Sequence, residues 1–167
     1  MEAPFLHDYV DDELEEREPR EQYVVFYLGD AECAARIDSV REIERVLKIT
    51  RVPRTPEWVE GITNLRGSLV TVIDLRSFLG MVRLTPTHAS RLVFSGAGDV
   101  VMGLLVDRVS DIRYLRPSEI RSPGADFHGG LAPYLRGVYQ LNDRLLFVID
   151  ITRVILSEKM RDLCLVC

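Results

Sequence analysis

The sequence has few cysteines and no long apolar run. Its three cysteines, Cys33, Cys164 and Cys167, cannot form a disulfide framework, and an odd count is typical of a reducing compartment. No apolar stretch approaches the ~20 residues that a membrane helix needs. The first residues lack the basic and then apolar pattern of a secretory signal. We therefore expect a cytoplasmic protein that does not itself insert into a membrane.

Motifs for catalysis, metal binding and nucleotide binding are also missing. His7, His88 and His128 are scattered along the chain. No Gly-x-Ser-x-Gly, His-Glu-x-x-His, Walker or Rossmann pattern occurs. The spacing of Cys164-Leu-Val-Cys167 leaves a redox or metal role open, although one such pair cannot complete a tetrahedral zinc site. We expect no catalytic residue, no cofactor and no metal ion, so the prediction is that the protein is not an enzyme.

The acidic charge is concentrated at the start of the chain. Residues 1–21 contain nine acidic and two basic side chains, whereas the whole chain has a net charge of −5 and the remainder is therefore slightly basic. Such a block predicts a disordered extension, and the overall balance argues against a general nucleic-acid binder. The extension could only solubilise the protein, or its apolar residues at roughly helical spacing could dock in a partner groove. Those residues are Phe5, Leu6, Tyr9, Val10 and Leu14.

From residue 22 onward the pattern favours short strands over long helices. β-branched and aromatic runs predict strands over 23–28, over 33–37 with a continuation through Ile43, and over 49–52. Turn residues predict hairpins with tips at Arg66-Gly67, at 95–99 and at Asn142-Asp143. We expect one helical turn over 54–60 and a helix over the last 18 residues, with an apolar stripe and with Asp150 as its cap. Asp74 is predicted to cap a helix in the same way.

The chain nearly repeats itself. Residues 37–43 match 106–112 at an offset of 69, and residues 61–75 match 137–151 at an offset of 76. The second copy therefore has seven extra residues, which fall in the region 117–133, rich in proline and glycine. The repeat predicts two related β units that are too small to be stable alone, share an interface and leave a groove for a ligand or a partner helix.

Two residues are candidates for binding a partner. Arg66 occupies a hairpin tip, where positive φ is unfavourable for a residue with a Cβ, so its guanidinium could be placed there to bind a partner carboxylate. The alternative is a wider turn with a merely solvated Arg66. Glu42 precedes Ile43, and an acid, Asp111, recurs at the equivalent place in the second copy. Glu42 could equally be an ordinary solvent-facing strand residue.

Several segments together resemble the CheW family of bacterial chemotaxis coupling proteins, from about residue 22 to residue 160. They are Phe26-Tyr-Leu-Gly-Asp30, Ile37-Asp-Ser-Val-Arg-Glu-Ile43, Val52-Pro53, Val59-Glu-Gly-Ile-Thr-Asn-Leu-Arg-Gly67, Val72-Ile-Asp-Leu75 and Gly103-Leu-Leu-Val-Asp-Arg-Val109. The resemblance implies an all-β fold of two intertwined five-stranded SH3-like β-barrel subdomains with short helices. We expect the subdomains at roughly 31–80 and 90–150, and a C-terminal helix and tail over 150–167.

The resemblance also implies a function. It predicts a non-catalytic adaptor or scaffold that couples the cytoplasmic tips of methyl-accepting chemoreceptors to the regulatory domain of the histidine kinase CheA, in arrays at the membrane. The implied partner-binding residues are Val40, Glu42, Gly61, Asn64, Arg66, Val109 and Ile112. The alternatives are a scaffold of a non-flagellar motility or other chemosensory-type pathway, a small-ligand sensor, and a redox protein.

Overall fold

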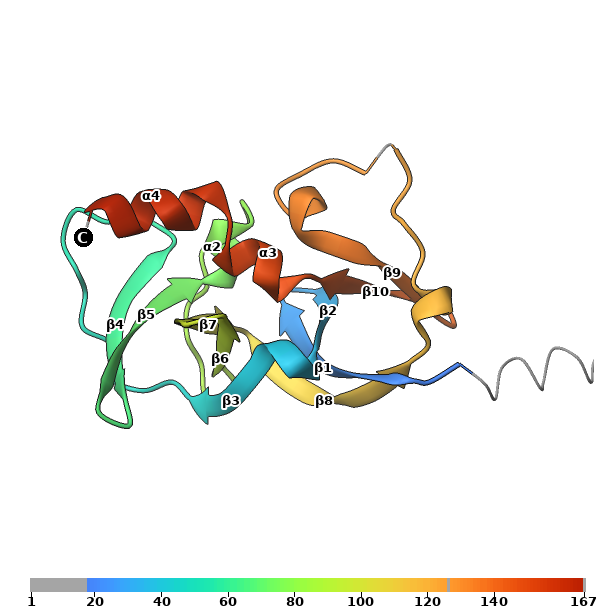
Figure 1. Cartoon of the computed structure of the whole chain (residues 1–167), viewed down its shortest axis with the longest axis horizontal. Helices are drawn as coiled ribbons and strands as arrows, with labels where there is room; N and C mark the ends of the chain where they lie inside the picture. The colour runs from blue at the N-terminus through green and yellow to red at the C-terminus, as the bar shows by residue number, and fades with distance from the viewer. Residues whose placement is uncertain (1–17, 126, 167) are drawn as a thin grey trace, which may run out of the picture.

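Two five-stranded sheets lie side by side along the long axis of the protein (Figure 1). The computed structural model describes residues 18–125 and 127–166, the last three by their backbone alone. Ten strands and a few short helices account for most of these residues, so the predicted all-β class is confirmed. No helix among the described residues is long and apolar enough to span a bilayer.

The first sheet has the strand order β8-β1-β2-β10-β9. Its pairings are antiparallel except that of β2 with β10, which is parallel. The strands are β1 (Glu21–Leu28), β2 (Ala31–Arg36), β8 (Arg108–Leu115), β9 (Leu135–Leu141) and β10 (Arg144–Ile149).

The second sheet has the order β3-β6-β7-β5-β4 and the same arrangement, with one parallel pairing between β5 and β7. Its strands are β3 (Val40–Arg45), β4 (Val59–Leu65), β5 (Ser68–Asp74), β6 (Arg91–Ala97) and β7 (Val100–Val106). All three predicted hairpins are present, as β4–β5, β6–β7 and β9–β10.

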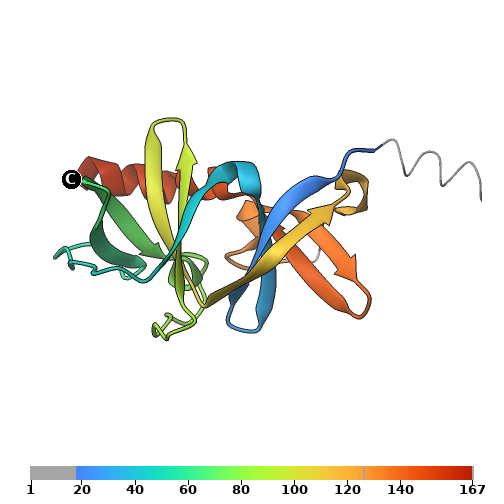
Figure 2. The same ribbon diagram turned by 90° about the horizontal axis from the view of Figure 1, so that it is seen from below.

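The two sheets do not coincide with the expected segments 31–80 and 90–150. The two copies of the repeat correspond to β1–β5 and β6–β10, but each copy gives its first two strands to the other copy's sheet. The β1–β2 hairpin completes the sheet of β8–β10, and β6–β7 completes the sheet of β3–β5 (Figure 2). This exchange is the intertwining that the resemblance implied. Spacing in the sequence does not reveal it, because alternation of apolar residues indicates where strands lie but not which strands pair.

One core cluster spans both sheets. It contains Phe26 and Cys33 from the first sheet and Ile73 and Leu104 from the second, all fully or almost fully buried. Two smaller clusters lie within the individual sheets. The expectation of a shared interface is therefore confirmed, and each sheet depends on the other to bury its apolar face.

Short helices follow the last strand of each copy. They are α2 (Leu75–Phe78), α3 (Ile151–Ile155) and α4 (Glu158–Val166). Asp74 accepts a hydrogen bond from the Ser77 N–H and Asp150 accepts one from the Arg153 N–H, so both predicted caps are confirmed. The C-terminal helix is divided at Leu156 and Ser157, where the Ser157 hydroxyl donates back to the Val154 carbonyl.

Three local predictions differ from the structure in extent. The strand expected over 33–43 is interrupted by a 3-10 turn, η1 (Ile37–Ser39), where the chain passes from one sheet to the other. The segment 49–52 forms only an isolated bridge between Thr50 and Ile62. The helical turn expected over 54–60 is one hydrogen-bonded turn, in which the Val59 N–H donates to the Pro56 carbonyl and after which β4 begins.

The expected N-terminal extension over 1–21 overlaps the folded part. Glu21 is the first residue of β1, and its carboxylate accepts hydrogen bonds from the Tyr23 hydroxyl and from Arg136. The Glu18 carboxylate accepts hydrogen bonds from Ser118. Residues 1–17 lie outside the described structure, and so does the expectation of disorder for them.

Candidate partner-binding surface

The β4–β5 hairpin ends in a two-residue tip. Leu65 pairs with Ser68, and between them Arg66 and Gly67 have φ of 52° and 87°. Positive φ at both residues is the geometry of a type I′ turn. The Asn64 side-chain oxygen accepts a hydrogen bond of 2.8 Å from the Gly67 N–H. Asn64 therefore holds the tip in shape, and the alternative of a wider turn is excluded.

Arg66 and Glu42 form an ion pair across the second sheet. The Arg66 Nη2 and Nε atoms donate to one oxygen of Glu42, at 2.6 and 3.3 Å. The two residues come from opposite edges of the sheet, since β3 and β4 are its outermost strands. The Arg66 side chain is 78% exposed, whereas that of Glu42 is 19% exposed. The pair thus fixes the guanidinium in place and leaves most of it open to solvent.

A second carboxylate adjoins this pair. Glu42 and Glu44 lie on the same face of β3, where their carboxyl groups can share a hydrogen bond once one of the two is protonated. The hydrogen bond from Arg66, and then that from Glu44, lower the pKa of Glu42. The bond to Glu42 raises the pKa of Glu44. The surface therefore offers one exposed cation beside two acids, which suits a partner with charges of both signs.

The remaining predicted residues have different surroundings. Val40 and Val109 are half-buried and pack against the core cluster shared by the two sheets. Ile112 pairs with Val24 on the edge strand β8, and its side chain is 51% exposed. Both β3 and β8 run along the junction of the sheets on the same side of the protein (Figures 1 and 2). Within the described residues, no hydrogen bond or ion pair links the β8 residues to the Arg66–Glu42 pair.

Gly61 has a structural reason to be glycine. Its φ is 144°, and a Cβ there would collide with the Thr50 carbonyl, which bridges to the neighbouring Ile62. The same arrangement recurs in the second copy, where a Cβ on Gly137 would lie 2.7 Å from the Arg121 carbonyl oxygen. In each copy the segment that precedes the hairpin therefore passes close to the first strand of that hairpin.

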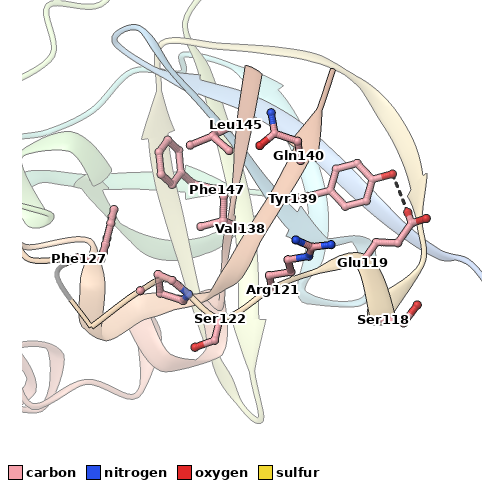
Figure 3. Close-up of a pocket in the computed structure, with 12 residues that line it drawn as sticks. Ser118, Glu119, Arg121, Ser122, Phe127, Val138, Tyr139, Gln140, Leu145 and Phe147 are labelled. Atoms are coloured by element: carbon pink, nitrogen blue, oxygen red, sulfur yellow. Dashed lines mark hydrogen bonds between the residues drawn. The ribbon is translucent and has the colours of Figure 1, made fainter. Parts of the chain in front are cut away.

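Two cavities that border the first sheet contain none of the seven predicted residues. One of about 450 Å³ lies where η1 and Gly96 meet the end of β10 and the start of α3. The other, of about 700 Å³, lies between β9–β10 and the loop that precedes them (Figure 3). Sequence reasoning missed the larger cavity, although the seven extra residues of the second copy marked the loop that forms it.

The described residues offer little support for a redox or metal role. Cys33 is fully buried, and burial raises the pKa of its thiol to about 12, so the reactive thiolate is scarce at neutral pH. The side chains of Cys164 and Cys167 lie outside the described residues. Among the side chains that the structure does describe, no three His, Cys, Asp or Glu come together as a metal site would require.

Comparison with known proteins covers almost the whole described chain. A family model described as CheW-like domain matches residues 22–159. The chemotaxis protein CheW of Klebsiella aerogenes is 35% identical over 141 residues, which are 84% of each chain. The chemotaxis protein CheW of Bacillus subtilis is 30% identical over 83% of this chain and 88% of its own. Protein FrzA of Myxococcus xanthus is 29% identical over 86% of this chain and 90% of its own.

A solved structure shares the fold. The scaffolding protein TtCheW from Thermoanaerobacter tengcongensis superposes with a TM-score of 0.76 at 26% identity, covering 84% of this chain and 95% of that one.

Proposed function

Because the chain belongs to the CheW-like domain family of chemotaxis scaffolds, we propose that it couples methyl-accepting chemoreceptors to the histidine kinase CheA. In this proposal the protein works in the cytoplasm, has no turnover of its own, and joins receptor arrays at the membrane through its partners. The match of the family model over residues 22–159 carries the proposal, since it includes both sheets and their junction.

The surface properties are those that a helical receptor tip needs. Such a helix offers an apolar stripe with charged flanks. Ile112 supplies exposed apolar area at the junction, while Arg66, at the tip of the β4–β5 hairpin, and the two acids beside it supply directed charge. Val40 and Val109 pack between this surface and the core that the two sheets share. Single contacts of this size bind modestly and gain strength from repetition in an array.

The regulatory domain of CheA is the second proposed partner. The resemblance implies that it has the same fold as this chain, so we expect the contact to join equivalent ends of the two molecules. In this proposal the receptor binds at the junction of the sheets and the kinase binds at the end of one sheet, so both partners can bind at the same time. A scaffold for a non-flagellar or other chemosensory-type pathway would use the same two surfaces with a different receptor class.

Arg66→Glu tests the receptor surface. The substitution replaces a cation that could bind a partner carboxylate with an anion that would repel it, and the new carboxylate would also face Glu42 and Glu44. We therefore expect receptor-tip binding to weaken on the order of tenfold or more. The measurement is co-sedimentation of the full chain with receptor fragments and CheA, with circular dichroism to verify the fold.

Arg83→Glu is the matched control. Arg83, in the loop that follows α2, also pairs with a glutamate, Glu60 of β4, at 3.0 Å, and neither residue is one of the seven predicted ones. It should bind like the wild type. Equal binding by Arg66→Glu and Arg83→Glu would contradict the assigned site, and failure of the wild type to bind CheA or any receptor tip would contradict the proposed function itself.

A further inference from the structure

The larger cavity is an open groove on the first sheet, lined by both apolar and polar side chains. We name it the Phe127–Phe147 groove, after two aromatic rings of its lining whose centroids lie 6.1 Å apart. Val138 and Leu145 continue its apolar side, and the Leu145 side chain is 47% exposed (Figure 3). Apolar area left open in a concave site is typical of a place where another chain segment binds.

The groove belongs to the second copy of the repeat alone. The loop that supplies Phe127 contains the seven residues that the first copy lacks. At the position of Phe147 the first copy has Thr71, whereas Leu145 has an equivalent leucine, Leu69. An extra loop and an extra aromatic side chain thus turn a plain sheet face into a groove.

The N-terminal segment begins at the rim of this groove. The Glu18 carboxylate accepts hydrogen bonds from the N–H and the hydroxyl of Ser118, at 2.9 and 2.5 Å, and Ser118 lines the groove. Residues 1–17 therefore leave the folded part beside it. Since an extended chain covers up to ~3.5 Å per residue, even a few of these residues can reach the groove floor.

The chemistry of the segment complements that of the groove. Residues 1–17 contain seven acids and one arginine, and they carry apolar side chains at roughly helical spacing. The lining of the groove has one acid, Glu119, which pairs with Arg116, and one arginine, Arg121. Arg121 lines the groove, is exposed, and makes no ion pair within the described part of the chain. Opposite charge would hold the segment near the groove while its apolar residues enter it.

We propose that the segment 1–17 binds in cis in the Phe127–Phe147 groove, with Tyr9, Val10 and Leu14 against the aromatic rings. The segment then acts as a tethered competitor for whatever binds this end of the first sheet. Tethering gives it an effective concentration in the millimolar range, so a weak contact suffices to occupy the groove. This inference does not depend on the identity of the partners proposed above.

Photo-cross-linking in the full chain tests the proposal. Tyr9→p-benzoylphenylalanine places a photoreactive group in the segment, and mass spectrometry locates the residues to which it joins. We expect intramolecular cross-links to 118–147, with a yield independent of protein concentration. Leu145→Ser should lower this yield about tenfold, because it removes one exposed apolar contact. Raising the salt concentration should lower it as well.

The internal repeat supplies the matched control. Leu69→Ser makes the same change at the equivalent position of the other sheet. Leu69 is 73% exposed and lines neither of the two cavities described above, so this variant should leave the yield unchanged. Cross-links that fall elsewhere, or that Leu145→Ser does not reduce, would overturn the proposal. Cross-links that join two chains and grow with concentration would also overturn it, because they would make a second copy the occupant.

Discussion

At the scale of single residues, Arg66 shows how an unfavourable conformation can be stabilised by its surroundings. Positive φ costs an arginine roughly 1 kcal/mol or more relative to glycine, yet Arg66 keeps a φ of 52°. The Asn64 side chain closes the turn, and Glu42 holds the guanidinium. At the equivalent tip of the second copy Asn142 has a φ of 50°, a conformation that asparagine tolerates more easily.

The carboxylates beside Arg66 should titrate as a coupled pair. Arg66 lowers the pKa of Glu42, whereas the bond to Glu42 raises that of Glu44, so we expect two steps on either side of 4.5. The pKa of Glu42 is lower in the folded protein than in the unfolded chain. Its stabilising contribution is therefore present above 4.5 and is lost as the pH falls through the lowered value. The pKa of Glu44 is raised in the folded protein, so its carboxylate destabilises the fold at neutral pH, and this effect disappears on acidification.

Carbon-detected NMR of the two side-chain carboxyls measures these steps. In Arg66→Gln the lower step should move upward toward 4.5, while a control at Arg83→Gln should leave it in place. Two carboxyls that both titrate near 4.5 in the wild type would show that the ion pair does not persist in solution.

At the scale of elements, the two copies use the same cap with different burial. Asp74 is fully buried and accepts hydrogen bonds from the N–H groups of Ser77 and Leu84, at 3.2 and 2.7 Å. Burial raises its pKa, and these backbone donors partly offset that effect. Asp150 is part-exposed and caps α3 through Arg153. Asp74 thus connects the end of β5, the start of α2 and the loop at Leu84, whereas Asp150 serves chiefly as a helix cap.

Substituting each cap should show this difference. Asp74→Asn keeps one acceptor for Ser77 but turns an amide N–H₂ toward the Leu84 N–H, so we expect a loss of about 1–3 kcal/mol in the free energy of unfolding. Asp150→Asn should cost less than about 1 kcal/mol, since asparagine is also a good N-cap. Urea unfolding of both variants measures the two values. Equal losses would mean that the Leu84 contact contributes nothing.

At the scale of the whole molecule, the exchange of strand pairs makes the two sheets one folding unit. The shared core takes side chains from β1 and β2 as well as from β5 to β7, and the smaller clusters are too limited to stabilise a sheet alone. Trp58, the only tryptophan, packs against this core and so reports on it.

Unfolding should therefore be a single transition. Leu146 is fully buried in the first sheet, so Leu146→Ala should cost about 2–5 kcal/mol and lower the denaturation midpoint equally by Trp58 fluorescence and by far-UV circular dichroism. The adjacent Leu145, which is 47% exposed, gives the control: Leu145→Ala should shift both midpoints little. Two separate midpoints in Leu146→Ala would show that the sheets unfold independently.

The sequence alone determined what depends on local pattern. Alternation and turn residues placed the three hairpins, the Val-Ile-Asp pattern placed both caps, and the repeat revealed two related β units. Arg66 was identified at its tip because a turn residue with a Cβ is conspicuous there. These features are set by a few neighbouring residues, so they can be read without knowing where the rest of the chain lies.

Only the tertiary structure decided which segments meet. It assigned β1–β2 to the other copy's sheet, joined Arg66 to Glu42 across 24 residues, and explained Gly61 by the passage of Thr50 over its strand. It also assembled the Phe127–Phe147 groove from a loop and a hairpin, next to the point where residues 1–17 begin. These contacts are long-range, and their energies depend on burial and charge that neighbouring residues do not specify.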